Sequence, residues 1–211
     1  LEQVIDRANK AQPDLIFVGG SQLQNSVDET VVHIKQLTTI PVVLFPGNAF
    51  QLTNKADALL LLSLISGRNA EWLIGQHVQA AKAIQQSALE TISTGYILID
   101  GGNTTAVERV SKTKPLQRDA IDEVVSTALA GQLLGHKLIY LEAGSGAQNP
   151  VPTALIKAVK RAINIPLIVG GGLTSTDAIK QAYEAGADIV VVGNYLETHL
   201  EKMVDFCAVR N

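Results

Sequence analysis

Hydrophobic residues along this chain occur in short, nearly continuous runs that alternate with amphipathic segments of helical period. Seven such runs are apolar almost throughout, as expected for strands that are buried on both faces of a parallel sheet. The predicted strands are 14–19, 41–45, 57–64, 94–100, 137–142, 166–170 and 188–193. Because strands alternate with helical segments, the pattern predicts a parallel α/β fold built from βα units.

Five segments carry the periodicity and the end signals of helices. They are 1–10, 69–82, 119–135, 176–185 and 195–209. Asn69 is a good capping residue for the second of these, and we interpret Trp72 and His77 within it as packing residues rather than catalytic ones. The segment 46–56 is too short and too rich in turn residues for a full helix, so a loop is expected there.

The order of these elements predicts a modified (βα)8 barrel. A closed barrel of this type has eight strands, and here a helical pattern precedes the first of only seven. We therefore expect that the first barrel strand is absent from this sequence, and that a loop replaces one outer helix. The 211 residues are expected to form a single domain, 1–211, that binds phosphate.

Composition narrows the range of functions. A hydrophobic content of 46% predicts a large core, and a net charge of −3 makes nucleic acid an unsuitable partner. Cys207 is the single cysteine, which fits a reducing cytoplasm, and we interpret it as an apolar filler of the last helix. No apolar run reaches the roughly 20 residues of a transmembrane helix, so any lipid contact is expected to be peripheral.

Glycines follow the last two predicted strands. The run 170–172 ends one strand, and Gly193 ends the next, with a helical segment after each. In barrels of this type, loops at these two positions point backbone N–H groups at a shared phosphate, and a Cβ would block its approach. Each run alone is most simply a turn, but the pair at equivalent strand ends predicts a phosphate site.

Glu142 is the predicted catalytic residue. It stands at the carboxyl end of a strand, where the active sites of barrel enzymes lie, and it can accept a proton from a hydroxyl. Side chains alternate along a strand, so Tyr140 and Glu142 should share one side while Leu141 faces the helices. Ser145 in the following glycine-rich loop offers a further hydroxyl. The alternative is that Glu142 only caps a helix or pairs with a lysine.

Several motifs resemble those of the geranylgeranylglyceryl phosphate synthase family. They are 17–21, 93–99, 140–147, 169–173 and 191–194, with 43–47 and 62–69 resembling its bacterial-type branch, which is related to heptaprenylglyceryl phosphate synthase. The resemblance implies a TIM-barrel prenyltransferase of ether lipid synthesis, with the third helix replaced by a loop. It implies transfer of a geranylgeranyl group from its diphosphate to the sn-3 hydroxyl of sn-glycerol 1-phosphate, with Mg²⁺ as cofactor and diphosphate as leaving group.

The resemblance also assigns roles to individual residues. Glu142 matches the family's base, and Ser21 matches a metal-contacting hydroxyl. The second metal ligand of the family is an aspartate on the strand that we expect upstream of residue 1, and one serine hydroxyl is a poor anchor for Mg²⁺ by itself. The positions that match glycerol phosphate contacts are Tyr140, Leu141, Glu142, Ala143, Gly144, Ser145, Gly146, Gly171, Gly172, Gly193 and Asn194.

The partners are less closely defined. Apolar residues near strand ends are candidates for the prenyl groove, namely Phe45, Leu64, Tyr96, Ile97 and Ile99, although such residues are usually core. Donor chains from C15 to C35 stay open. From the resemblance we expect a homo-oligomer, either a dimer or a hexamer, and peripheral contact with a membrane for product release.

Two hypotheses from other classes remain open. One is a different phosphate-binding barrel enzyme, such as an isomerase or aldolase, although no predicted strand ends in the lysine that such an enzyme often uses. The other is a non-catalytic barrel that binds a phosphorylated metabolite. Titration of Mg²⁺ and diphosphate against the protein would separate the second hypothesis from the enzyme.

Overall fold

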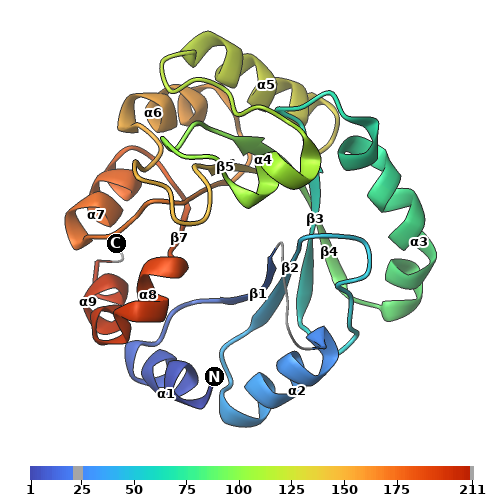
Figure 1. Cartoon of the computed structure of the whole chain (residues 1–211), viewed down its shortest axis with the longest axis vertical. Coiled ribbons are helices and arrows are strands. Elements are labelled where there is room, and N and C mark those ends of the chain that lie inside the picture. The colour runs from blue at the N-terminus through green and yellow to red at the C-terminus, as the bar shows by residue number, and fades with distance from the viewer. Residues whose placement is uncertain (21–25, 210–211) are drawn as a thin grey trace.

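A curved parallel sheet lies at the centre of the protein, and helices surround it (Figure 1). The computed structural model describes residues 1–20 and 26–209. The strands are β1 (Ile16–Gly20), β2 (Val42–Pro46), β3 (Ala58–Leu64), β4 (Glu90–Leu98), β5 (Leu138–Glu142), β6 (Leu167–Gly170) and β7 (Ile189–Val191). They neighbour one another in chain order, and every pairing is parallel. The predicted parallel α/β fold is confirmed.

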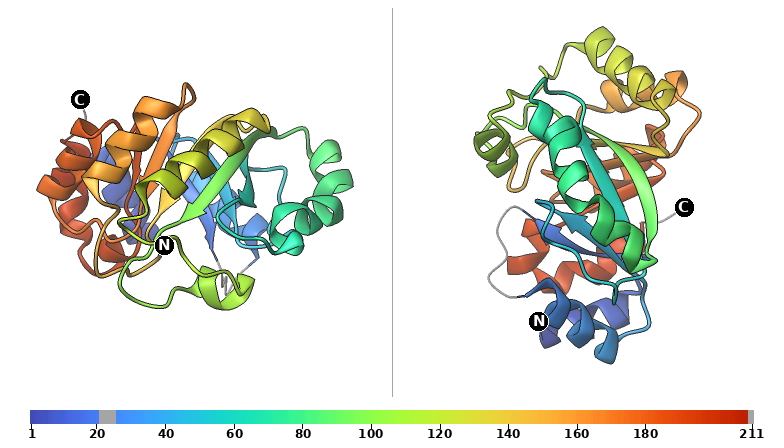
Figure 2. Two further views of the ribbon diagram at one scale, coloured as in Figure 1. Left: turned by 90° about the horizontal axis from the view of Figure 1, so that it is seen from above. Right: turned by 90° about the vertical axis from the view of Figure 1, so that its right-hand side faces the viewer.

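Helices follow most of the strands, and most of them pack against the outside of the sheet (Figure 2). They are α1 (Glu2–Ala11), α2 (Val27–Leu37), the π turn η1 (Glu71–Gly75), α3 (Gln76–Ser87), α4 (Ala106–Ser111), α5 (Ile121–Leu133), α6 (Thr153–Ala162), α7 (Thr176–Glu184), α8 (Asn194–Thr198), the 3₁₀ turn η2 (Leu200–Lys202) and α9 (Met203–Cys207). Unlike most of these helices, α4 packs through Val107 against the hydrophobic cluster inside the curve of the sheet. No helix among the described residues is long and apolar enough to cross a membrane.

Alternation along the strands separates two hydrophobic layers. On β5, Leu138 and Tyr140 belong to a cluster inside the curve of the sheet, whereas Ile139 and Leu141 pack with α5 and α6 on the outside. Both layers are largely apolar because helices cover the outer face of the sheet, while inward side chains from several strands pack on one another inside its curve. Glu142 follows Tyr140 by two residues, so it also points inward at the carboxyl end of the sheet.

The sheet opens between β2 and β3. In the described part of the chain, only two residue pairs join these strands, Val43 with Ala58 and Leu44 with Leu59. The connecting segment 47–57 lies wholly within the described residues and contains no helix, as its turn-rich sequence predicts. The last residues of β2 and of β3 therefore diverge without a helix to fill the space, and this divergence creates the groove described below.

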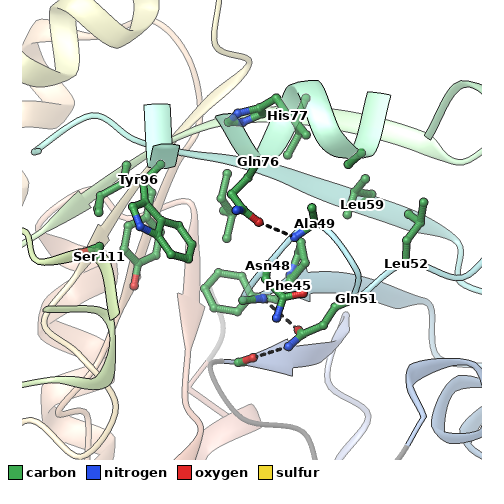
Figure 3. A pocket seen from close by; sticks show the side chains of 18 of the residues that line it. Phe45, Asn48, Ala49, Gln51, Leu52, Leu59, Gln76, His77, Tyr96 and Ser111 are labelled. Atoms are coloured by element: carbon green, nitrogen blue, oxygen red, sulfur yellow. Dashed lines mark hydrogen bonds between the residues drawn. The ribbon is translucent and has the colours of Figure 1, made fainter. Parts of the chain in front are cut away.

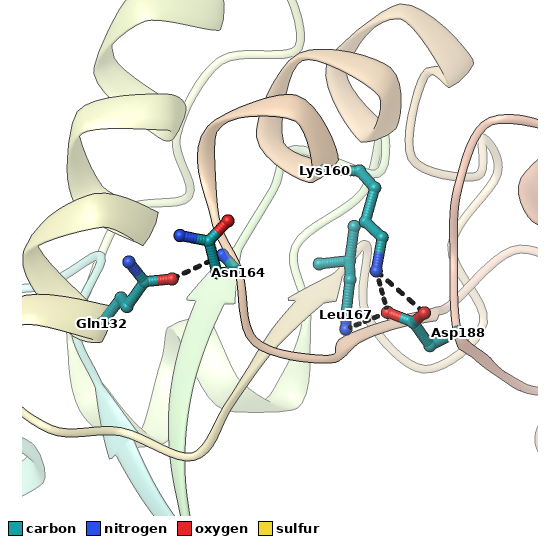
Figure 4. Close-up of polar contacts among 5 residues, drawn as sticks. All are labelled: Gln132, Lys160, Asn164, Leu167 and Asp188. Carbon is teal, nitrogen blue, oxygen red and sulfur yellow. Dashed lines mark hydrogen bonds and ion pairs between the residues drawn. The ribbon is translucent and has the colours of Figure 1, made fainter.

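Polar contacts join strands and helices at the amino end of the sheet, opposite the predicted site (Figure 4). Lys160 of α6 forms an ion pair with Asp188, at 2.6 Å from its Oδ2, and that oxygen accepts a hydrogen bond from the N–H of Leu167 over 2.7 Å. Gln132 of α5 accepts from the N–H of Asn164 over 2.6 Å. These contacts satisfy backbone donors at the starts of strands and hold α5 and α6 in place.

The structure differs from the sequence prediction in several places, and α2 and α6 form in segments where no helix is predicted. The predicted helix 195–209 is wrong as one element, because it divides into α8, η2 and α9. At this break, Thr198 and His199 direct side-chain hydrogen bonds to the carbonyl of Tyr195 and compete with the helical ladder. The short helix α4, capped by Thr105, lies in a segment where the sequence pattern predicts no helix. Strand β4 begins at Glu90, four residues earlier than predicted.

Among the described residues, β1 and β7 are the two edge strands of the sheet, and no pairing joins them. The two edges lie on the side of the molecule where α1, α8 and α9 gather (Figure 1). The α1 helix packs there against the C-terminal elements through Ala8, Ala11 and Met203. These contacts hold the first and last described elements together, although the sheet itself is not closed.

Candidate functional site

The carboxylate of Glu142 is buried at the carboxyl end of β5. Only 7% of the residue is exposed, and its Oε1 accepts a hydrogen bond from the N–H of Gly144 over 2.7 Å. The hydroxyl of Tyr140, on the same face of the strand, donates a second hydrogen bond to the carboxylate. Two hydrogen-bond donors therefore fix the orientation of a carboxylate that is almost completely shielded from solvent.

Burial and these two hydrogen bonds act in opposite directions on the acidity of Glu142. Burial raises the pKa of the carboxyl above its ordinary value, and the hydrogen bonds from Tyr140 and Gly144 oppose the rise. Burial, reinforced by the carboxylate, also raises the pKa of Tyr96 and of Tyr140. Both phenols therefore stay protonated, and Tyr140 remains a donor to Glu142.

Glycines after β5 and β6 let two loops meet at this carboxylate. Gly144, Gly146, Gly171 and Gly172 all have positive φ, which other residues rarely adopt. A Cβ on Gly171 would lie 2.5 Å from Oε1 of Glu142 and 2.7 Å from the N atom of Gly144. Only glycine fits this point of contact, and the backbone there faces the space beside the carboxylate.

The loop after β7 joins the same cluster. Ser145 donates a hydrogen bond to the side-chain oxygen of Asn194, which is the first residue of α8. Gly193 precedes this short helix, and no described atom lies within 4 Å of where its Cβ would be. The loops that follow β5, β6 and β7 thus converge, as the spacing of the glycine motifs predicts.

The structure brings most of the predicted site residues together. The side chains of Leu141 and Ala143 are exceptions, because both are fully buried in the outer layer of the core, so only their backbone can face a ligand. Ser21, the predicted metal contact, lies outside the described residues. Within residues 1–20 and 26–209, no group of three or more His, Cys, Asp or Glu side chains could hold a metal ion.

An apolar groove crosses the opening between β2 and β3 (Figure 3). It has about 920 Å³ of empty space, part of it open to solvent. Phe45 and Tyr96 line it and also pack on Tyr140, with ring centroids 5.5 Å and 5.4 Å from the Tyr140 ring. Two residues of the groove therefore contact the ring whose hydroxyl is hydrogen bonded to Glu142.

Three of the five residues predicted for a prenyl groove line this apolar groove and two do not; that it binds a prenyl chain stays a prediction. Phe45, Leu64 and Tyr96 line the groove. Ile97 and Ile99 are fully buried in the outer layer of the core, because they stand on the opposite face of the sheet.

The sequence pattern predicts helix packing for Trp72 and His77, yet both line the groove. The packing prediction is confirmed at the same time, because Trp72 packs against the inner cluster and Nε2 of His77 is hydrogen bonded to the Ser63 hydroxyl of β3 over 3.2 Å. Burial lowers the pKa of His77, which favours the neutral imidazole in these apolar surroundings.

Two residues of the site are missed by reasoning from the sequence. Gly170 pairs with Glu142 across the sheet, and a Cβ on it would collide with the hydroxyl of Tyr140. Its place at the start of the glycine run is a signal that could have identified it. Gln76 contacts the loop that borders the groove, and nothing in the local sequence distinguishes it from an ordinary polar surface residue.

The sequence matches the model of the PcrB family over residues 1–210. The chain belongs to the PcrB family. It is 56% identical to the geranylgeranylglyceryl phosphate synthase of Zunongwangia profunda over 183 residues, which are 86% of this chain and 78% of that protein. It is 50% identical to the protein of the same name from Flavobacterium johnsoniae over 198 residues, 93% of this chain and 82% of that one.

A solved structure supports the same family. The crystal structure of (S)-3-O-geranylgeranylglyceryl phosphate synthase from Thermoplasma acidophilum, in complex with its substrate sn-glycerol-1-phosphate, matches with a TM-score of 0.93 and 34% identity. The match covers 99% of this chain and 85% of that one. The seven-stranded sheet of this PcrB family member is therefore the TIM-barrel-like fold of that synthase.

Proposed function

We propose that this protein is a geranylgeranylglyceryl phosphate synthase. It transfers the geranylgeranyl group of geranylgeranyl diphosphate to the sn-3 hydroxyl of sn-glycerol 1-phosphate, forms the ether bond of a lipid precursor and releases diphosphate. The observation that carries the proposal is the position of the buried Glu142, which contacts the glycine loops directly. Through Tyr140 it is also linked to two aromatic residues that line the apolar groove. This arrangement suits one small phosphate ester and one long apolar donor.

The glycine loops are proposed to hold glycerol phosphate. Residues 144–146, 171–172 and 193–194 present backbone N–H groups that can donate to phosphate oxygens, as in other barrels with phosphate sites after the last two strands. The bond between Ser145 and Asn194 ties two of these loops together before the ligand arrives. An ester held by its phosphate presents its free hydroxyl to a fixed point, which supplies much of the rate.

Glu142 is proposed to accept the proton of that hydroxyl. The groove begins at the aromatic rings that pack on Tyr140, so the allylic carbon of a bound donor lies near the carboxylate. As the hydroxyl oxygen bonds to this carbon, the C–O bond to diphosphate breaks and the hydroxyl proton passes to Glu142. Tyr140 and Gly144 stabilise the ionised form in which Glu142 can act as a base.

Dependence on Mg²⁺ is also part of the proposal, because the family resemblance implies it. The described residues do not by themselves form a site that fits the ion, and Ser21 lies outside them. When bound, Mg²⁺ would neutralise charge on the diphosphate. No step above depends on its position. We expect product formation to stop when the metal is chelated and to resume when Mg²⁺ is added in excess.

The finer architecture and the assembly are proposals as well. We propose that the loop 47–57 takes the place of the third helix of the family's barrel. We also propose a homo-oligomer, dimer or hexamer, and a peripheral membrane contact for release of the lipid product. Leu133 and Leu134, 83% and 78% exposed at the end of α5, are the kind of surface that an oligomer would cover. Light scattering of the purified protein would give the oligomeric state.

The test is a product assay with matched acceptors and a series of donors. Purified protein and Mg²⁺ are incubated with sn-glycerol 1-phosphate and C15, C20 or C35 prenyl diphosphate, with sn-glycerol 3-phosphate as the control acceptor. We expect most product from the C20 donor and from the sn-1 ester. Preference for C35 would make the protein a heptaprenylglyceryl phosphate synthase instead. Binding of glycerol phosphate without any product would favour a non-catalytic barrel.

A further inference from the structure

Two side-chain amides hold the loop between β2 and β3 against the groove. Residues 47–57 form no helix or strand, so most of their N–H groups have no ladder partners. Gly47 donates its N–H to Oε1 of Gln51 over 2.9 Å, and Ala49 donates its N–H to Oε1 of Gln76 over 2.8 Å. Gln51 in turn donates to the carbonyl of Gly20 over 2.8 Å. The loop is thus tied to the end of β1 and to the start of α3 (Figure 3).

The π turn before α3 orients Gln76. Residues Glu71–Gly75 form this single wide turn, in which the N–H of Gln76 donates to the carbonyl of Glu71. The same two residues meet through their side chains, because the Glu71 carboxylate accepts a hydrogen bond from the Gln76 amide. With its nitrogen held in this way, Gln76 turns its oxygen to Ala49. Single π turns occur often at functional sites.

Gly75 makes this arrangement sterically feasible. A Cβ at that position would collide with the carboxylate of Glu71, so a larger residue would push Glu71 away from Gln76. The loop that these contacts hold lines the groove through Gly47, Asn48 and Ala49, whereas the adjacent Phe50 is 83% exposed. The hydrogen bonds therefore fix the part of the loop that forms the groove wall.

We propose that Gln76, oriented by Glu71, is a positioning residue that keeps the β2–β3 loop closed against the prenyl chain. This inference rests on the proposed function, since it takes the groove as the donor site. A wall that is ordered before the donor binds need not lose entropy on binding, so the donor binds more tightly. The glycerol phosphate loops lie elsewhere, after β5, β6 and β7. Loss of the Gln76 contact should therefore weaken binding of the prenyl donor and leave binding of glycerol phosphate almost unchanged.

The first measurement compares Gln76→Leu with the wild-type protein. We expect the KM for geranylgeranyl diphosphate to rise roughly 2- to 10-fold, the range for loss of one hydrogen bond. The kcat and the KM for sn-glycerol 1-phosphate should change little. Gln79→Leu is the matched control, because Gln79 also donates to Glu71, over 2.9 Å, but no hydrogen bond within the described residues joins it to the loop. Its kinetics should equal those of the wild type.

Exchanging the amide and the carboxylate between positions 71 and 76 tests whether the donor KM depends on the hydrogen bonds of Gln76 or only on the shape of its side chain. Gln76→Glu alone places a second carboxylate beside Glu71 and should raise the donor KM. The double variant Glu71→Gln/Gln76→Glu restores one donor and one acceptor in reversed order, so the donor KM should return toward the wild-type value. A donor KM that is unchanged in Gln76→Leu, or a double variant no better than Gln76→Glu, would overturn the proposal.

Hydrogen exchange separates this proposal from the proposed function. The N–H of Ala49 should exchange roughly 2- to 10-fold faster in Gln76→Leu than in the wild type. This readout needs no activity. Equal exchange in the two proteins would refute the positioning role even if the protein is a synthase. If exchange rises as expected but the wild type makes no prenylated product, the loop contact stands and the proposed function fails.

Discussion

The two ends of the candidate site are built in different ways. At the proposed glycerol phosphate end, glycines with positive φ bring two loops against one buried carboxylate, and a hydrogen bond between the Ser145 and Asn194 side chains joins the third. At the proposed prenyl end, ordinary apolar side chains from β2, β3 and α3 border an open groove. A charged ester needs donors at fixed points, whereas an apolar chain needs only buried surface. The first end should therefore tolerate substitution far less than the second.

Replacement of Glu142 by Gln should produce the largest difference between the two ends. The amide keeps the size of the side chain and can still accept from Gly144, but it cannot take a proton. We expect kcat to fall roughly 10²- to 10⁴-fold, the usual contribution of a general base. The KM for sn-glycerol 1-phosphate should change little in steady-state assays. Equal losses in kcat and in affinity for the ester would argue against the role of base.

Gly171→Ala should damage the glycerol phosphate end by steric means. The added Cβ would lie 2.5 Å from the Glu142 carboxylate, on a residue with φ of 82°. Strain of this kind costs about 1–3 kcal/mol, so the KM for the ester should rise roughly 5- to 100-fold. Gly135→Ala is the control, because Gly135 also has positive φ but lies outside the site, with no described atom within 4 Å of a Cβ. It should affect thermal stability alone, and a similar KM change in both variants would contradict the steric argument.

The difference between the two ends also explains which parts of the site can be predicted from the sequence. The seven strands, the inward direction of Glu142 and the meeting of the glycine loops follow from local rules, namely buried runs, alternation and positions that only glycine can occupy. The groove depends on the divergence of β2 from β3 and on the π turn at Glu71–Gly75, which are tertiary features without a local signal. For that reason Trp72 and His77 resemble helix packing in the sequence, and Gln76 resembles a surface residue.

Trp72→Ala tests whether Trp72 limits the length of the prenyl donor. Trp72 is the largest side chain that lines the groove, and its removal would lengthen or widen the space for the donor. We expect kcat/KM for a C35 donor relative to a C20 donor to rise roughly 10-fold, as is typical when an apolar pocket gains or loses methylene-sized volume. Competition between the two diphosphates, with products separated by chain length, would measure it. An unchanged ratio would mean that Trp72 does not limit the donor.

The smallest effect concerns stability rather than turnover, and it follows from the burial of Glu142. Burial raises the pKa of this carboxyl in the folded protein, so folding favours its protonated form. The associated stability is fully present below the unfolded pKa and is lost as pH rises through the folded pKa. The amide that replaces the carboxyl in Glu142→Gln does not ionise. The Tm of this variant should therefore exceed that of the wild type above the folded pKa, and the difference should shrink in acid.

Calorimetry of both proteins from about pH 4 to pH 8 would test this sign. The kcat of the wild type should fall in acid over the same interval, because a protonated Glu142 cannot accept a proton. A Tm difference that is constant with pH would show that the carboxyl does not carry the expected cost of burial. A larger Tm for the wild type at high pH would mean that the hydrogen bonds from Tyr140 and Gly144 outweigh burial, and the pKa of Glu142 would then be lowered rather than raised.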